Sequence, residues 1–426
     1  MYTNLISLLL AVNLISPYLS SWFNNILPFP PGAMLRDVIS FVLIAIILGR
    51  AFLGREKLDI FKVFLLLTWL ALAALVLVLI IYSPDKIQAI MGARSYILFP
   101  SIFICIAMLM RSDKSDVNAY KLSRFSVYVL AFCALIAIID VLMHGEFIKL
   151  LGYDSHYAGE QFRLIDSYDD TIRATGGFSD ALNFGYTLAI GVFLCMECYA
   201  QRIMRKRMLI LSLIMSVAVC MTLTRGAILI VFLIYFAYFV TNRTLIKTVC
   251  VLCILMIPVI AIQTTYLDKY TDLLVGRFTD SSATSKGSTQ GRFDMAAKSM
   301  AYLADNPMGV GLGTQGSGNL IAQDDKRINT DNYFFWMALE TGILGLILNL
   351  IYIITQFIYG LSRQLINEKI HPLRPYMVMM MAYFIASALS SAPSSSTFSL
   401  FFWCVLALLP GLKLHKGYYE KNHNGY

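Results

Sequence analysis

Hydrophobic runs of helix length recur along the whole chain and are separated by short polar stretches. Most of them approach the ~20 residues that an α-helix needs to cross a bilayer. The runs fall at residues 3–22, 34–53, 61–82, 95–110, 124–143, 179–200, 208–223, 226–241, 247–264, 332–360, 374–391 and 396–412. The pattern predicts an all-α, polytopic membrane protein with about twelve transmembrane helices.

Two long polar stretches interrupt the apolar pattern, at residues 144–178 and 265–331. The second contains one segment with helical periodicity, residues 292–304, in which Phe293, Ala297, Met300 and Ala304 line one side. Asp305-Asn306-Pro307 should end this helix. A loop of this length is usually either functional or disordered, and the stop signals and aromatic residues favour a functional loop. We expect the helix to lie on the membrane surface or over the mouth of the helix bundle.

Composition excludes a soluble protein and favours a single membrane domain, residues 1–426. The chain is 58% hydrophobic and 14% charged, with a mean hydropathy of +0.68. Its net charge of +8 would suggest a nucleic-acid partner in a soluble protein. Here the basic residues follow the positive-inside rule, so we predict no nucleic-acid partner.

The distribution of basic residues predicts that both termini are cytoplasmic. With the N-terminus inside, every predicted inside loop is basic, whereas the short outside loops hold only Arg36, Lys86, Arg94 and Arg225. The same topology makes 144–178 the first periplasmic loop. It makes 265–331 a large periplasmic loop between helices 9 and 10.

No motif predicts a metal or a cofactor. The eight cysteines all lie in apolar runs, and the five histidines form no ligand cluster. Residues 311–316 match the pattern GxGxxG, but they follow no strand and open no βαβ unit. We interpret them as a glycine-rich turn close to other backbone.

Arginines on the predicted outer side are the candidate functional residues. Charged residues at membrane depth are usually functional or paired, and a guanidinium group binds diphosphate oxygens bidentately. The five outer arginines are Arg94, Arg173, Arg225, Arg277 and Arg292. Each could instead reach the interface or pair with a loop carboxylate.

Polar residues at two helix entries accompany these arginines. Asp331 and Asn332 come directly before a long apolar run, whereas Glu340 lies about half a helical turn out of phase with Asp331. We expect Glu340 to make helix–helix hydrogen bonds. Asp180 and Asn183 could hold Arg173 or a sugar hydroxyl, and structural pairing is favoured.

In combination, these segments resemble the O-antigen ligase and O-antigen polymerase superfamily. The resembling features are an Asn-Pro-x-Gly-x-Gly loop (306–311), a polar pair Asp331-Asn332, nine residues, and Gly-x-x-Gly (342–345). Residues 223–226, the segment 173–183 and Gly291-Arg292 resemble the arginine motifs of the family. The resemblance covers roughly residues 170–360. Ligases carry His where this chain has Asp331, which favours a polymerase.

The resemblance implies a GT-C-like fold and a metal-independent glycosyltransferase at the periplasmic face of the bacterial inner membrane. The substrate would be an oligosaccharide on undecaprenyl diphosphate, in contact with membrane lipid, and a chain-length regulator and a flippase would be functional partners. Asp331, Arg225 and Arg292 would be catalytic. The substrate-binding residues would be Arg173, Arg277, Arg94, Asn332 and Asn183.

The sequence is compatible with more than one role for Asp331 and with more than one reaction. Asp331 is the first candidate for the base that activates the acceptor hydroxyl, but nearby arginines would weaken it as a base, so it could instead orient the acceptor or an arginine. A ligase that transfers glycan to lipid A-core is the alternative within the family. A transporter or flippase is the alternative of another class, although no similarity between the two halves supports it.

Overall fold

The computed structural model describes residues 2–23, 31–52, 59–109, 118–147, 167–168, 171–178, 180–201, 203–241, 283–315, 330–367 and 373–423. Apart from loops and turns, this part of the chain is helical, with one antiparallel pair of two-residue strands, β1 (Ser167–Tyr168) and β2 (Thr171–Ile172). The hairpin lies in the first long polar stretch, where no secondary structure was predicted. The fold class is therefore confirmed as an essentially all-helical, multi-pass membrane protein.

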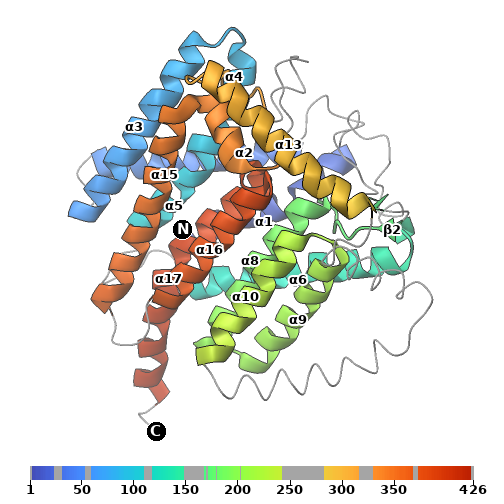
Figure 1. The fold of residues 1–426 in the computed structure, drawn as a ribbon. Helices are drawn as coiled ribbons and strands as arrows, with labels where there is room; N and C mark the ends of the chain where they lie inside the picture. The colour runs from blue at the N-terminus through green and yellow to red at the C-terminus, as the bar shows by residue number, and fades with distance from the viewer. Residues whose placement is uncertain are drawn as a thin grey trace. The chain divides into compact units, whose positions relative to one another are not determined.

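The chain forms two compact units. Figure 1 labels the helices and strands that belong to them. Unit 1 comprises Met1–Ser20, Phe29–Ser126 and Gly291–Tyr426, and unit 2 comprises Ser21–Pro28 and Val127–Gln290. The elements centred in unit 1 are α1 (Tyr2–Phe23), α2 (Pro31–Phe52), α3 (Ile60–Tyr82), α4 (Lys86–Ala93), the π-helix η1 (Arg94–Leu98), α5 (Phe99–Leu109), α15 (Tyr333–Asn367), α16 (Leu373–Leu389), the 3-10 helix η2 (Ala392–Ser394) and α17 (Ser396–His423).

Unit 2 contains the hairpin and three further helices, α8 (Ala181–Ala200), α9 (Arg205–Met221) and α10 (Arg225–Thr241). Three of the described helices contribute residues to both units: the last turn of α1, α6 (Ala119–Leu142) and α13 (Ala283–Asp305).

Most predicted transmembrane runs are confirmed as helices with closely matching bounds. Six described helical stretches are long and apolar enough to cross a membrane: Gly32–Arg50, Ile60–Tyr82, Lys86–Leu109, Ala119–Leu142, Ala181–Ala200 and Tyr333–Ser362. Shorter apolar helices lie at Tyr2–Ser16, Arg225–Tyr238 and Ser396–Leu412. The predicted run 247–264 lies outside the described residues, so the full count of twelve stays a prediction.

Two helical predictions were wrong in extent. The run predicted at 95–110 belongs to a helical stretch that already begins at Lys86 and changes to π geometry at Arg94–Leu98. Asp85 explains the earlier start, because its side chain caps the helix by accepting from Gln88 N. The helix predicted at 292–304 extends back to Ala283, through the Ser- and Thr-rich stretch, and ends at Asp305 as predicted.

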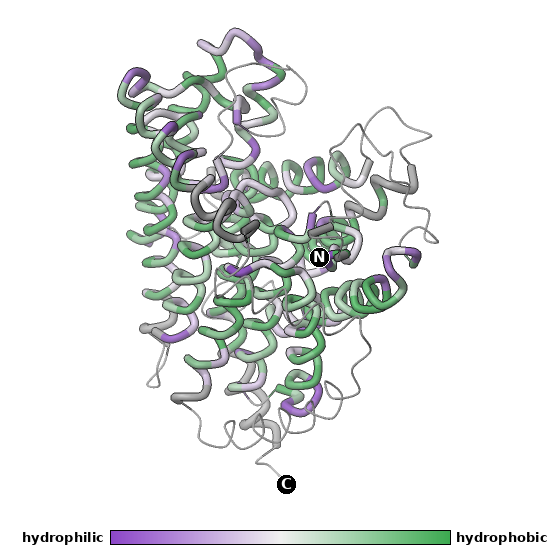
Figure 2. The backbone as a smooth tube through the Cα atoms, turned by 45° about the vertical axis from the view of Figure 1, so that its right-hand side comes forward, coloured by the Kyte–Doolittle hydropathy of each residue, from purple (hydrophilic) through white to green (hydrophobic). Residues whose placement is uncertain are grey.

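Aromatic and aliphatic side chains form the core of unit 1. Here α5 packs against α2 and α17, and α3 packs along α15. The aromatic centre consists of Phe103, Tyr383, Phe402 and Trp403, with ring centroids 5.0–6.4 Å apart. Figure 2 shows that the helices are mainly hydrophobic along their length and that polar residues gather toward their ends. This is the distribution that a bilayer requires.

In unit 2, α8 is the central helix and packs against α9 and α10. Its residues are buried along most of their length, from Ala181 to Tyr199. The start of α8 lies against the turn that joins α9 to α10, since a Cβ atom on Gly185 would lie 2.9 Å from Thr222 Oγ1.

Candidate functional site

Unit 2 holds one group of the predicted site residues, around the turn between α9 and α10. Residues 222–224 join α9 to α10, and Arg225 is the first residue of α10. Leu223 holds this turn in the left-handed region (φ 54°) and is fully buried. Such strain in a non-glycine residue is maintained only where the surroundings fix the backbone.

Arg173 is one of the groups that fix this turn. Its Nε donates to Thr222 O at 2.8 Å and its Nη2 donates to Thr224 Oγ1 at 3.1 Å. The next residue, Ala174, donates its backbone N–H to Met221 O at 3.0 Å. The structure therefore brings Arg173 to the turn that ends in Arg225. The positive end of the α10 dipole lies at the same place.

Asp180 and Asn183 pair with each other at the start of α8. Asp180 caps α8, accepting from Asn183 N at 2.6 Å and from Asn183 Nδ2 at 2.5 Å. Asn183 Oδ1 is buried and has no hydrogen-bond partner in the described structure. Asn183 therefore belongs to the capped first turn of α8, and its Oδ1 is an acceptor without a partner among the described residues.

Another group of predicted site residues lies in unit 1, at the start of α15. Asn332 caps this helix, because its Oδ1 accepts from Phe334 N at 2.9 Å and from Phe335 N at 3.3 Å. Asp331 precedes the cap and is exposed. A carboxylate at this position is favoured by the helix dipole and is accessible to a substrate.

α15 is broken at Gly342, a feature that the hydrophobic pattern did not predict. Gly342 has φ 72° and ψ 178°, a backbone region that only glycine adopts readily. Two hydrogen bonds of the interrupted helix are made instead with the end of the large loop. Ile343 N donates to Pro307 O at 3.0 Å, and Val310 N donates to Leu339 O at 2.7 Å.

We call residues 307–315 the docking segment, because they fill this break and also press against α4. A Cβ atom on Gly313 would lie 2.2 Å from Gln88 O, and one on Gly92 would lie 2.2 Å from Gly313 N. Backbones can approach so closely only where side chains are absent. The predicted glycine-rich turn close to other backbone is confirmed.

Glu340 anchors the far end of the docking segment. Its carboxylate accepts from Gln315 N at 3.0 Å and from the Tyr96 hydroxyl at 2.8 Å. It is only 1% exposed, whereas Asp331 is exposed. The predicted helix–helix role of Glu340 is confirmed, since Tyr96 belongs to η1 and Glu340 to α15.

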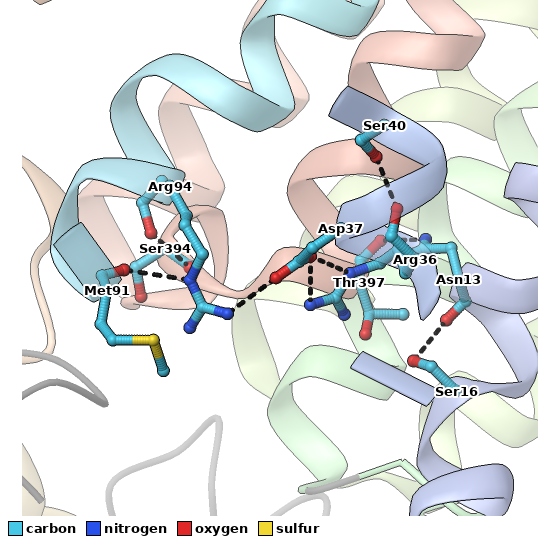
Figure 3. Close-up of polar contacts among 10 residues, drawn as sticks. Asn13, Ser16, Arg36, Asp37, Ser40, Met91, Arg94, Ser394 and Thr397 are labelled. Carbon is cyan, nitrogen blue, oxygen red and sulfur yellow. Dashed lines mark hydrogen bonds and ion pairs between the residues drawn. The ribbon is translucent and has the colours of Figure 1, made fainter. Parts of the chain in front are cut away.

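An ion network joins α2 to the π-helix in the same unit (Figure 3). Asp37 Oδ1 lies 3.0 Å from both Nε and Nη2 of Arg36, and Asp37 Oδ2 accepts from Arg94 Nη1 at 2.8 Å. Arg94 Nε also donates to Met91 O at 3.2 Å. The next residue, Ser95, donates to Ser394 O at 3.1 Å, so η1 is tied to η2 beside Arg94.

The structure thus groups the predicted residues by unit. Arg173, Asn183 and Arg225 lie at one end of unit 2, and Arg94, Asp331 and Asn332 lie in unit 1. Arg292 lies on α13, where the backbone but not this side chain is described. Arg277 lies outside the described residues.

Sequence reasoning missed two features of unit 1. Arg36 was counted only as a basic loop residue, and Asp37 was not considered, although adjacent opposite charges near a predicted helix start are a visible signal. The helix break at Gly342 was also missed, because one glycine inside an apolar run does not by itself indicate a break.

Two comparisons with known proteins bear on these features. The family model described as O-antigen ligase (Wzy_C) matches residues 210–350, which include the Arg225 turn, the docking segment and the start of α15. A curated O-antigen polymerase from Salmonella muenchen is 54% identical over 395 residues. The matched region covers 91% of this chain and 98% of that relative.

Proposed function

Since this chain belongs to the O-antigen polymerase family, we propose that it extends O-antigen on undecaprenyl diphosphate at the periplasmic face of the inner membrane. It is then a glycosyltransferase of lipopolysaccharide biosynthesis. The growing glycan is transferred from its lipid diphosphate to the non-reducing end of the next lipid-linked repeat unit. Both termini are proposed to be cytoplasmic, as the positive-inside pattern indicates.

The reaction exchanges one bond to an anomeric carbon for another. A hydroxyl oxygen of the acceptor sugar attacks the anomeric carbon at the reducing end of the growing chain. The bond from that carbon to the diphosphate oxygen breaks, and undecaprenyl diphosphate leaves with the electron pair. The acceptor proton goes to a base, for which Asp331 is our first candidate.

The observation that carries this proposal is the turn held by Arg173. A leaving diphosphate accumulates negative charge, and preorganised cationic donors stabilise that charge without a metal. Arg173 is fixed by its two bonds to Thr222 and Thr224, and Arg225 begins the next helix. The guanidinium group of Arg173, which is bonded to this turn, and that of Arg225, which directly follows it, form a candidate clamp for the donor diphosphate.

Two observations favour a polymerase over a ligase. One is Asp331, which stands where ligases carry His, and the other is the 54% identity to a curated O-antigen polymerase. A ligase would transfer the finished glycan to lipid A-core instead. The experiment is a chromosomal deletion, complemented with this chain and examined by lipopolysaccharide gel. Loss of a polymerase leaves one repeat unit on each core, and complementation restores the ladder. Bare core in the deletion strain would instead indicate a ligase, and an unchanged ladder would exclude both activities.

Asp331→Asn is expected to lower the rate of chain extension about 100-fold or more, because the amide cannot accept the acceptor proton. Asp331→Glu keeps a carboxylate and should retain part of the rate. Both variants should be compared at equal membrane abundance with purified lipid-linked repeat units. If Asp331→Asn retains a substantial rate, Asp331 orients a substrate or an arginine and does not take the proton.

A further inference from the structure

We propose that Arg94, held in place by Asp37, binds the diphosphate of the second lipid-linked substrate, the acceptor. This inference rests on the proposed polymerase function. It assigns the ion network of unit 1 a ligand distinct from the donor diphosphate that Arg173 and Arg225 would hold in unit 2.

The need for two anion sites follows from the reaction. Both the growing chain and the incoming repeat unit carry a lipid diphosphate, and both must be bound at the moment of transfer. Each diphosphate lies at the membrane surface, where it requires cationic donors. One arginine clamp serves one of the two groups, so a second cationic site is required.

Arg94 has the donors for such a site. A guanidinium group carries five N–H donors in a planar fork. Arg94 Nη1 donates to Asp37 and Nε donates to Met91 O, whereas Nη2 makes no hydrogen bond with the described residues (Figure 3). Phosphate oxygens would be bound by Nη2 and by the second hydrogen of Nη1.

The charges of the network also favour an anion. Arg36 and Arg94 share the single carboxylate of Asp37, so the group of three carries one excess positive charge. Arg36 is 4% exposed and its guanidinium lies 5.4 Å from the centre of the Phe99 ring. Uncompensated charge is costly in such surroundings. Arg94, at 22% exposed, is the member through which an anion can approach.

The position of Arg94 suits the acceptor. It is the first residue of the π-helix, a rare geometry that frequently occurs at functional sites. Gly92, two residues before it, touches the docking segment, and the docking segment fills the break in α15. Asp331 precedes that same helix, so the proposed anion site and the candidate base belong to the same compact unit.

The test is the number of undecaprenyl diphosphate molecules that bind to the purified full-length protein, measured by native mass spectrometry across a concentration series. The wild-type protein should bind two. Arg94→Ala should weaken one site at least 10-fold and leave the other, and Arg173→Ala should weaken the other site only. Arg94→Lys keeps the charge without the fork, so it should weaken the same site to a smaller extent.

The matched control is Lys86→Gln. Lys86 is an outer cation on the same helical stretch, and it donates to the backbone carbonyls of Ile80, Ile81 and Ser83. Its replacement should leave two sites. If Arg94→Ala does not yield folded protein, the binding of undecaprenyl diphosphate to Arg94→Lys tests the inference instead. Unchanged affinity at both sites in Arg94→Lys would overturn the inference.

The outcomes separate this inference from the proposed function. If the wild-type protein binds one molecule, and Arg173→Ala but not Arg94→Ala weakens it, the network is only a contact between helices and the acceptor site is refuted. If Arg173→Ala and Arg225→Ala leave both sites intact while Arg94→Ala removes one, the donor clamp is wrong and the inference stands. Absence of any binding to the wild-type protein would refute both.

Discussion

Replacing Arg173 with alanine is expected to abolish the long O-antigen ladder while the protein still inserts in the membrane. The substitution removes a cationic donor from the proposed diphosphate clamp, and a preorganised donor of this kind is typically worth about 100-fold or more in rate. It also removes the bonds to Thr222 O and Thr224 Oγ1 that brace the strained turn before Arg225. Arg225→Ala should have a comparable effect on extension without loss of the brace.

Conservative replacement separates charge from geometry in this clamp. Lysine supplies one charged group from a single point and cannot reproduce the planar fork. Arg173→Lys and Arg225→Lys should therefore also be impaired. Extension should be measured both as ladder length in cells and as the initial rate with purified lipid-linked repeat units.

Arg205→Ala is the matched control within unit 2. Arg205 lies at the other end of α9 and contacts the Tyr199 ring, 5.6 Å from its centre. Its loss should leave the ladder unchanged. Near-normal ladders from both Arg173→Ala and Arg225→Ala would contradict the clamp and would require another source of charge stabilisation for the leaving diphosphate.

Gly342→Ala is expected to release the docking segment from α15 and to stop chain extension. A Cβ atom at this position would lie 2.7 Å from Met308 C and 2.8 Å from Pro307 O, and the backbone has φ 72°. An alanine there costs about 1–3 kcal/mol in backbone strain, before any clash. The least costly relaxation is a regular helix through residue 342, which breaks the bonds of Ile343 N to Pro307 O and of Val310 N to Leu339 O.

Amide hydrogen exchange measures this release directly. The Val310 amide should exchange faster in Gly342→Ala, since its acceptor on α15 is lost. Gly49→Ala is the matched control, because a Cβ atom on that helical glycine would meet nothing within 4 Å. It should be neutral or slightly stabilising. Wild-type exchange at Val310 together with a normal ladder in Gly342→Ala would refute the functional importance of docking.

The sequence by itself determined the class of the molecule and the position of most of its helices. Apolar runs such as 61–82 and 179–200 leave the chain little alternative in a bilayer, because backbone groups in hydrocarbon must be paired within a helix. For the same reason the bounds of α3 and α8 agree with the pattern to within one or two residues. The order of the arginines, Asp331 and the Gly-x-x-Gly motif was also sufficient to indicate the family.

Only the tertiary structure decided what these residues contact. Gly342 and the docking segment are about thirty residues apart in the chain. The helix break exists because backbone groups of α15 next to Gly342 form hydrogen bonds with backbone groups of the docking segment. Asp37 and Arg94 are 57 residues apart, and neither signals its partner in the local sequence. Periodicity reports which face of a helix is apolar, whereas a hydrogen bond between distant segments depends on how whole elements pack. The helices could therefore be predicted from the sequence. The bonds of Arg173 to the turn before Arg225, the break in α15 and the ion network around Arg94 could not.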